Sequence, residues 1–145
     1  MENWFLEPLQ KTRQTVTEFG LGEFPDGIIF DDENHLWVTC IISNRLIRVA
    51  PNGNKEILLE DCDLVNMNAV EKKYQLGQLE SDDFTKVRPK ILRNISCTAF
   101  GGDDLRTVWL GSLQGCSLAS FRSPIKGIKP VHWKVYPKWV DKLIL

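Results

Sequence analysis

One carboxylate in this chain stands in a setting that could do chemistry. Asp26 lies in the bend Pro25-Asp26-Gly27, directly before an apolar stretch. A carboxylate presented at the start of a strand is a suitable ligand for a hard divalent cation. Such a cation polarises a carbonyl group and stabilises the negative charge that develops on its oxygen when water attacks. An aspartate between proline and glycine is also common in tight turns, so the spacing alone leaves both interpretations open.

Two further polar side chains are candidates for binding a substrate. Asn94 and Ser96 precede an apolar stretch that resembles the one after Asp26, so we expect them near the same end of the fold. They could line a channel and hydrogen-bond a ligand there. The alternative is that they bond local backbone where a strand begins. Glu23, just before the Pro-Asp-Gly bend, is expected to be a solvated loop acid.

The histidines and cysteines do not form a recognisable site. His35 and His132 have no partners at the spacing of zinc ligands. The four cysteines are not paired at such spacing either. Cys40 and Cys97 lie in apolar strand patterns, where a free cysteine behaves as a small buried hydrophobic residue. We therefore expect structural histidines and free thiols.

The elements that must position these residues are mostly short strands separated by turn residues. The predicted strands are 13–19, 27–31, 36–41, 45–50, 55–60, 95–100, 107–112, 117–122 and 130–136. A helix is expected at about 64–77, because Asp63 is a suitable N-cap and apolar residues follow it at helical spacing. Residues 80–89 are polar and are expected to form a surface loop.

The chain repeats internally. Phe30 aligns with Phe100, and Trp37 with Trp109, each about 70 residues further along. Four antiparallel strands in each repeat are the unit of a β-propeller, whereas a β-sandwich of eight or nine strands is the competing fold. We predict an all-β fold: a partial β-propeller of about two four-stranded blades, plus one N-terminal strand, with one inserted helix. Residues 1–145 would form a single domain, with blade-like units at about 13–63 and 93–136 and the helix and loop insert at about 64–92.

Composition sets the remaining bounds. The chain has 145 residues, with 18 basic and 19 acidic side chains and a net charge of -1. This balance gives no reason to expect binding to nucleic acid or to an anionic membrane. No apolar run approaches the roughly 18 residues that span a bilayer, and the first residues lack the basic and apolar regions of a signal peptide. A cytoplasmic location is therefore expected.

Four phrases, taken in order, resemble a known family. They are Phe24-Pro25-Asp26-Gly27, Leu36-Trp37-Val38-Thr39, the stretch from Asn44 to Gly53, and the stretch from Thr98 to Gly111 that contains Phe100-Gly101-Gly102. This order is similar to the C-terminal part of the domain of the senescence-marker-protein, regucalcin and gluconolactonase family. The resemblance covers roughly residues 19–133.

The resemblance implies a six-bladed propeller that hydrolyses sugar lactones and related esters. It also implies a divalent metal, calcium or else zinc or manganese, in the central channel. In the family, a glutamate near the N-terminus, an asparagine in the middle and the aspartate of Pro-Asp-Gly hold this metal. Only the aspartate carries over, so the resemblance makes Asp26 both metal ligand and catalytic residue. The other two ligands belong to a region that this sequence does not include.

Two classes of function follow. The first is a metal-dependent lactone or ester hydrolase of the gluconolactonase type, acting on a small lactone or ester. Two blades per chain would close a six-bladed ring from three copies, placing three Asp26 carboxylates around one axis. The second is a non-catalytic binding or interaction protein, a remnant propeller without a complete active site. Open blade faces and strand edges need cover in either case, so we expect a homo-oligomer.

Overall fold

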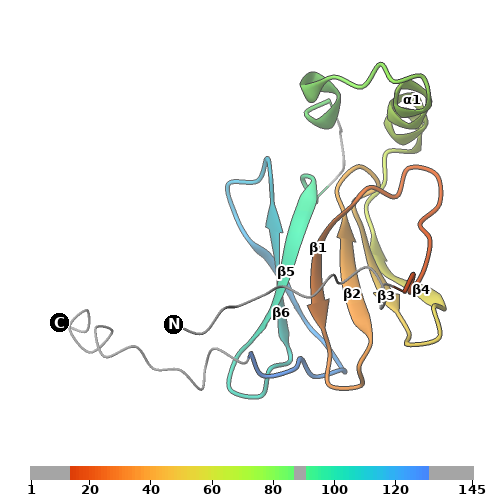
Figure 1. Ribbon diagram of the computed structural model, residues 1–145. Coiled ribbons are helices and arrows are strands. Elements are labelled where there is room, and N and C mark those ends of the chain that lie inside the picture. Colours follow the sequence, from red (N-terminus) through yellow and green to blue (C-terminus); the bar gives the residue numbers. More distant parts are fainter. Residues whose placement is uncertain (1–13, 87–90, 131–145) are drawn as a thin grey trace, which may run out of the picture.

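Two antiparallel sheets make up most of the structure (Figure 1). The computed structural model describes residues 14–86 and 91–130. The first sheet has the order β1 (Pro25–Phe30), β2 (Leu36–Cys40), β3 (Arg45–Val49) and β4 (Lys55–Glu60). The second sheet has the order β5 (Ile95–Gly101), β6 (Thr107–Ser112) and β7 (Ala119–Arg122). The described part is thus mostly β, as the strand pattern predicts.

The predicted strand at the N-terminal side is wrong for the residues that the structure describes. Residues 14–20 form no strand. The Thr17 hydroxyl donates to the carbonyl of Gly53 over 3.0 Å, and the Lys55 ammonium donates to the carbonyl of Glu18 over 2.9 Å. Hydrogen bonds that involve side chains thus join this segment to Gly53 and Lys55, while Phe19 packs against the first sheet. The last predicted strand, at 130–136, lies outside the described residues except for Pro130.

The main core lies between the two sheets. Trp37 of β2 meets Phe100 of β5 edge to face, with ring centroids 4.8 Å apart and planes at 68°. Such a pair contributes about 0.5–1.5 kcal/mol beyond the area that it buries. The buried residues of this core are Trp37, Leu46, Leu92, Ile95, Phe100, Leu105, Val108 and Leu110. The two sheets therefore pack face to face through strands of both predicted units.

A helix and a short 3-10 helix lie together at one end of the sheets (Figure 1). Helix α1 spans Leu64–Gln75, close to the predicted bounds, and Asp63 caps it by accepting from the backbone N–H of Asn66 over 3.1 Å. The 3-10 helix η2 spans Ser81–Phe84, within the predicted surface loop. Met67 of α1 is buried against Ile42, which fixes the helix to the first sheet. No helix in the described part of the chain is long and apolar enough to cross a bilayer.

Asp31 stabilises the turn between β1 and β2 from within. Its fully buried carboxylate accepts from the indole N–H of Trp37 and from Nε of Arg48, each over 2.8 Å. It also accepts from the backbone N–H groups of Glu33 and His35. Burial acts to raise the pKa of Asp31, but the hydrogen bonds from Arg48 and Trp37 outweigh it and leave that pKa below its ordinary value.

The sequence repeat is also a repeat of strand register. Phe30 pairs with Leu36 in the first sheet, and their counterparts Phe100 and Val108 pair in the second. Trp37 is opposite Ile29, and its counterpart Trp109 is opposite Ala99. Residues that align in sequence therefore take matching places and point to matching faces of their sheets.

Candidate functional site

Asp26 is exposed at the start of β1, in a β-bulge. The pairing of β1 with β2 shifts by one residue between Pro25 and Ile28, so Asp26 and Gly27 share one position of the ladder. The buried hydroxyl of Thr39 holds the bulge: it accepts from the N–H of Gly27 over 3.0 Å and donates to its carbonyl over 3.3 Å. Bulges redirect side chains and are frequent next to active sites.

Ser96 is the counterpart of Asp26 in the second unit. Both residues stand four positions before the repeated phenylalanine, Phe30 or Phe100. The pairing of β5 with β6 also shifts by one residue, between Ile95 and Cys97, so Ser96 occupies a bulge as well. It is half-buried. Asp26 and Ser96 thus correspond in the sequence repeat, and each also occupies a bulge in its sheet.

The two bulges lie against each other. A methyl group added to Gly27 would lie 2.4 Å from the carbonyl oxygen of Ser96 and 2.8 Å from Cα of Cys97. Only a glycine permits this approach. Figure 1 shows β5 beside β1, with both strands beginning at the end where α1 lies. The structure therefore brings the Asp26 and Ser96 segments together.

Asn94 lies in the interior of the fold, directly before β5. It is fully buried, in the left-handed backbone region at φ 55°, and its side-chain N–H₂ donates to the carbonyl of Phe84 over 2.8 Å. This bond ties η2 to the start of β5. Its side-chain oxygen finds no partner among the described residues. The contact to Phe84 spans ten residues and therefore differs from the local backbone bond that the sequence offered as the alternative for Asn94.

Glu23 is not the solvated loop acid that its position suggests. Its side chain is 10% exposed and pairs with Arg45 over 3.4 Å and Lys55 over 3.1 Å. Burial acts to raise the pKa of Glu23, but a bond from the N–H of Gly20 and the two cations lower it. Glu23 therefore fastens the segment before β1 to β3 and β4.

Cys97 is exposed, although its strand pattern predicts burial, whereas Cys40 is buried as predicted. The bulge at Ser96 changes the alternation of faces at this point of β5. In the second unit Gly111 takes the place of Thr39, and a methyl group on Gly111 would lie 2.4 Å from Sγ of Cys97. Thr39 is the residue of the site that sequence reasoning missed. Its only signal is its place opposite the Pro-Asp-Gly phrase.

Among residues 14–86 and 91–130, no three histidine, cysteine, aspartate or glutamate side chains are grouped to hold an ion. Calcium takes six to eight oxygen ligands in proteins. Asp26 is therefore not part of a preformed cluster of such side chains in the described part of the chain.

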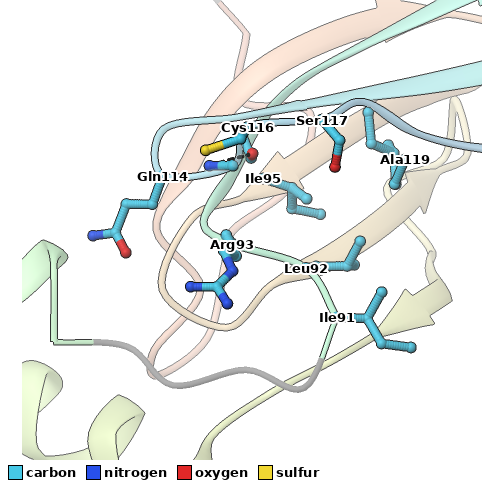
Figure 2. Close-up of a pocket in the computed structure, with 11 residues that line it drawn as sticks. Ile91, Leu92, Arg93, Ile95, Gln114, Cys116, Ser117 and Ala119 are labelled. Atoms are coloured by element: carbon cyan, nitrogen blue, oxygen red, sulfur yellow. Dashed lines mark hydrogen bonds between the residues drawn. The ribbon is translucent and has the colours of Figure 1, made fainter.

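A separate hollow of about 580 Å³ lies beside the start of β5. In Figure 2 the side chains of Leu92, Ile95 and Ala119 gather on one side of it, and Arg93 and Gln114 extend on the other. None of the predicted site residues lines this hollow. It is therefore distinct from the place where β1 meets β5.

Comparison with known proteins gives no assignment. No model of a known protein family matches the chain, and no curated protein sequence matches it. The resemblance to the gluconolactonase family therefore rests on the four phrases that contain Asp26, Trp37, Pro51 and Phe100.

Proposed function

We propose that this chain is a subunit of a metal-dependent lactone or ester hydrolase of the gluconolactonase type, with Asp26 in its site. The observation that supports this proposal is the pair of facing bulges. Asp26 is exposed at the first of them, and Ser96 stands at the second. The backbone segments that carry these two polar residues thus lie against each other, and their close approach depends on Gly27.

The chemistry that these side chains can perform is hydrolysis of an activated ester. Water attacks the carbonyl carbon of the lactone, the ring C–O bond breaks, and the ring oxygen takes the proton that the water gave up, so that a hydroxy acid leaves. The Asp26 carboxylate accepts the proton of the attacking water, a role that commonly contributes about 10²–10⁴-fold to a rate. The Ser96 hydroxyl donates a hydrogen bond to the substrate.

The site is completed by other copies of the chain. Three copies with two units each supply the six blades of the proposed propeller, and a cyclic arrangement places three Asp26 carboxylates around one axis. Three carboxylates are a reasonable ligand set for a divalent ion, which a single carboxylate is not. The divalent metal in this proposal is calcium, zinc or manganese.

The decisive experiment is hydrolysis of a panel of sugar lactones with calcium, zinc or manganese added in turn. The wild-type chain should hydrolyse at least one lactone, and Asp26→Asn should lower the rate by about 10²-fold or more. Asp32→Asn is the matched control, because Asp32 is an exposed aspartate of the neighbouring turn. Equal activity of the wild type and Asp26→Asn would refute a catalytic Asp26.

A non-catalytic interaction protein is the second candidate. The observation in its favour is that large apolar side chains remain exposed on strands, among them Ile28, Phe30 and Trp109. Exposed apolar patches commonly mark contact surfaces. Association without hydrolysis of any lactone, whichever metal is added, would favour this candidate over the hydrolase.

A further inference from the structure

We propose that copies of this chain associate head to tail, with Trp109 of one copy packing against Phe30 of the next. The front face of a sheet is defined here as the face that carries Trp37 in the first sheet and Trp109 in the second. The back face carries Phe30 in the first sheet and Phe100 in the second. This contact would join the copies in the proposed assembly. The inference depends on the internal repeat and does not require that the chain be catalytic.

The chain already contains one example of this contact. The front face of the first sheet meets the back face of the second, and Trp37 packs edge to face on Phe100 at 4.8 Å. Trp37 is 1% exposed and Phe100 is 6% exposed. A front face carrying the repeated tryptophan and a back face carrying the repeated phenylalanine are therefore complementary surfaces.

The two remaining faces each carry an exposed aromatic side chain in the described part of the chain. Trp109 on the front of the second sheet is 42% exposed, and Phe30 on the back of the first sheet is 50% exposed. Leu118, which aligns with the fully buried Leu46, is 63% exposed. The counterparts of Trp37, Phe100 and Leu46, which are buried in the internal contact, are thus exposed.

The back face of the first sheet limits where a second copy can dock. Phe19 packs against the cluster of Val38, Cys40, Ile47 and Val49, so part of the face over β2 and β3 is covered. Ile28 and Phe30 on β1 stay exposed. In the internal contact Val108 and Leu110 of β6 join Phe100 of β5 on the back face, whereas their counterparts Leu36 and Val38 on the first sheet are not exposed. The contact between copies is therefore centred on β1 of one chain and β6 of the other.

Each copy carries one open front face and one open back face, so the contact is heterologous. Heterologous contacts continue from copy to copy and either close a ring or form a filament. Two units per chain close a six-bladed ring after three copies. The internal repeat favours another copy of this chain as the partner that covers each face, because every copy carries both complementary faces.

The test uses the full 145-residue chain and measures mass by sedimentation equilibrium and light scattering over a range of concentrations. The wild type should be larger than a monomer, with about three chain masses as the limit. Phe30→Glu and Trp109→Glu should each raise the dissociation constant about 30-fold or more, as loss of a central aromatic contact does. Val65→Glu is the matched control, because Val65 is 83% exposed on α1, away from both faces. This variant should associate like the wild type.

Mixing the two variants separates this proposal from other arrangements. Phe30→Glu retains an intact front face, and Trp109→Glu retains an intact back face. An equimolar mixture should therefore form dimers and nothing larger. Circular dichroism verifies that each variant is folded, and Phe30→Ser with Trp109→Ser replaces the pair if a glutamate variant is not.

Four results would overturn the proposal. A monomeric wild type would mean that the faces are covered within the chain, by residues 1–13 or 131–145. Loss of association in Trp109→Glu alone would indicate a symmetric contact between front faces. Unchanged association of both variants would place the contact elsewhere, and a mixture without dimers would exclude the head-to-tail pairing. Association without lactone hydrolysis refutes only the hydrolase, whereas hydrolysis by a monomer refutes this contact.

Discussion

Replacing Gly27 with alanine tests the approach of the two bulges, on which the candidate site depends. The added methyl group would lie 2.4 Å from the Ser96 carbonyl oxygen, 2.8 Å from Cα of Cys97 and 3.0 Å from the Thr39 hydroxyl oxygen. Two of these atoms belong to the backbone, so a change of side-chain conformation cannot relieve the overlap. The strands must separate by roughly 0.5–1 Å, which removes a quarter to a half of the dispersion energy of each contact across the gap.

The expected loss of stability lies near the upper end of the range for added methyl groups in packed interiors. We expect Gly27→Ala to lower the free energy of unfolding by about 2–3 kcal/mol. Urea unfolding at one fixed protein concentration measures it, and the midpoint should fall by about 1 M. The same variant should weaken any lactone hydrolysis, because Asp26 precedes the displaced residue directly.

Gly20→Ala is the matched control for this substitution. A methyl group on Gly20 has Oε2 of Glu23 as its nearest neighbour, at an ordinary 3.7 Å. Its effect should stay within about 0.5 kcal/mol, as for most surface substitutions. If Gly27→Ala is no more destabilising than Gly20→Ala, β1 and β5 do not meet as described, and the argument that joins Asp26 to Ser96 fails.

Three further substitutions or reactions test the structure around the site. Thr39→Val should lower the free energy of unfolding by about 1–3 kcal/mol in urea titrations, because it leaves the polar groups of the bulge without their buried partner. Asp31→Asn should lower it by about 3 kcal/mol near pH 7. The folded pKa of Asp31 is lowered from 3.8, so its contribution is present above pH 4 and the difference from wild type should shrink as pH falls below that; a constant difference would contradict this. Burial raises the pKa of Cys40 to about 12, so a thiol reagent at pH 8 should modify the exposed Cys97 and Cys116 quickly and Cys40 only after unfolding.

The sequence predicts most strands correctly because each is short, alternating and bounded by turn residues. The segment at 14–19 is also predicted as a strand, but it lies against a sheet through Phe19 and forms no strand itself. A single sequence does not separate these two cases, since an apolar side chain packs against the core in both. The same limit explains why a segment that covers a sheet is mistaken for part of it.

The candidate site was only partly predictable. Asp26 stands out because proline and glycine flank it, and the repeat relates it to Ser96. Thr39 and Gly27 act through a bulge and through a contact between strands about 70 residues apart, neither of which leaves a local pattern. Asn94 lies in the interior because the backbone turns at a positive φ directly before β5. The residue type alone does not predict that turn.

Metal titration of the wild-type chain by calorimetry tests the central claim most directly. The claim is that Asp26 contributes one carboxylate to a site shared between copies. We predict uptake of about one divalent ion per three chains, and no uptake by Asp26→Asn under the same conditions. Uptake of one ion per chain, or equal uptake by the wild type and Asp26→Asn, would contradict the account.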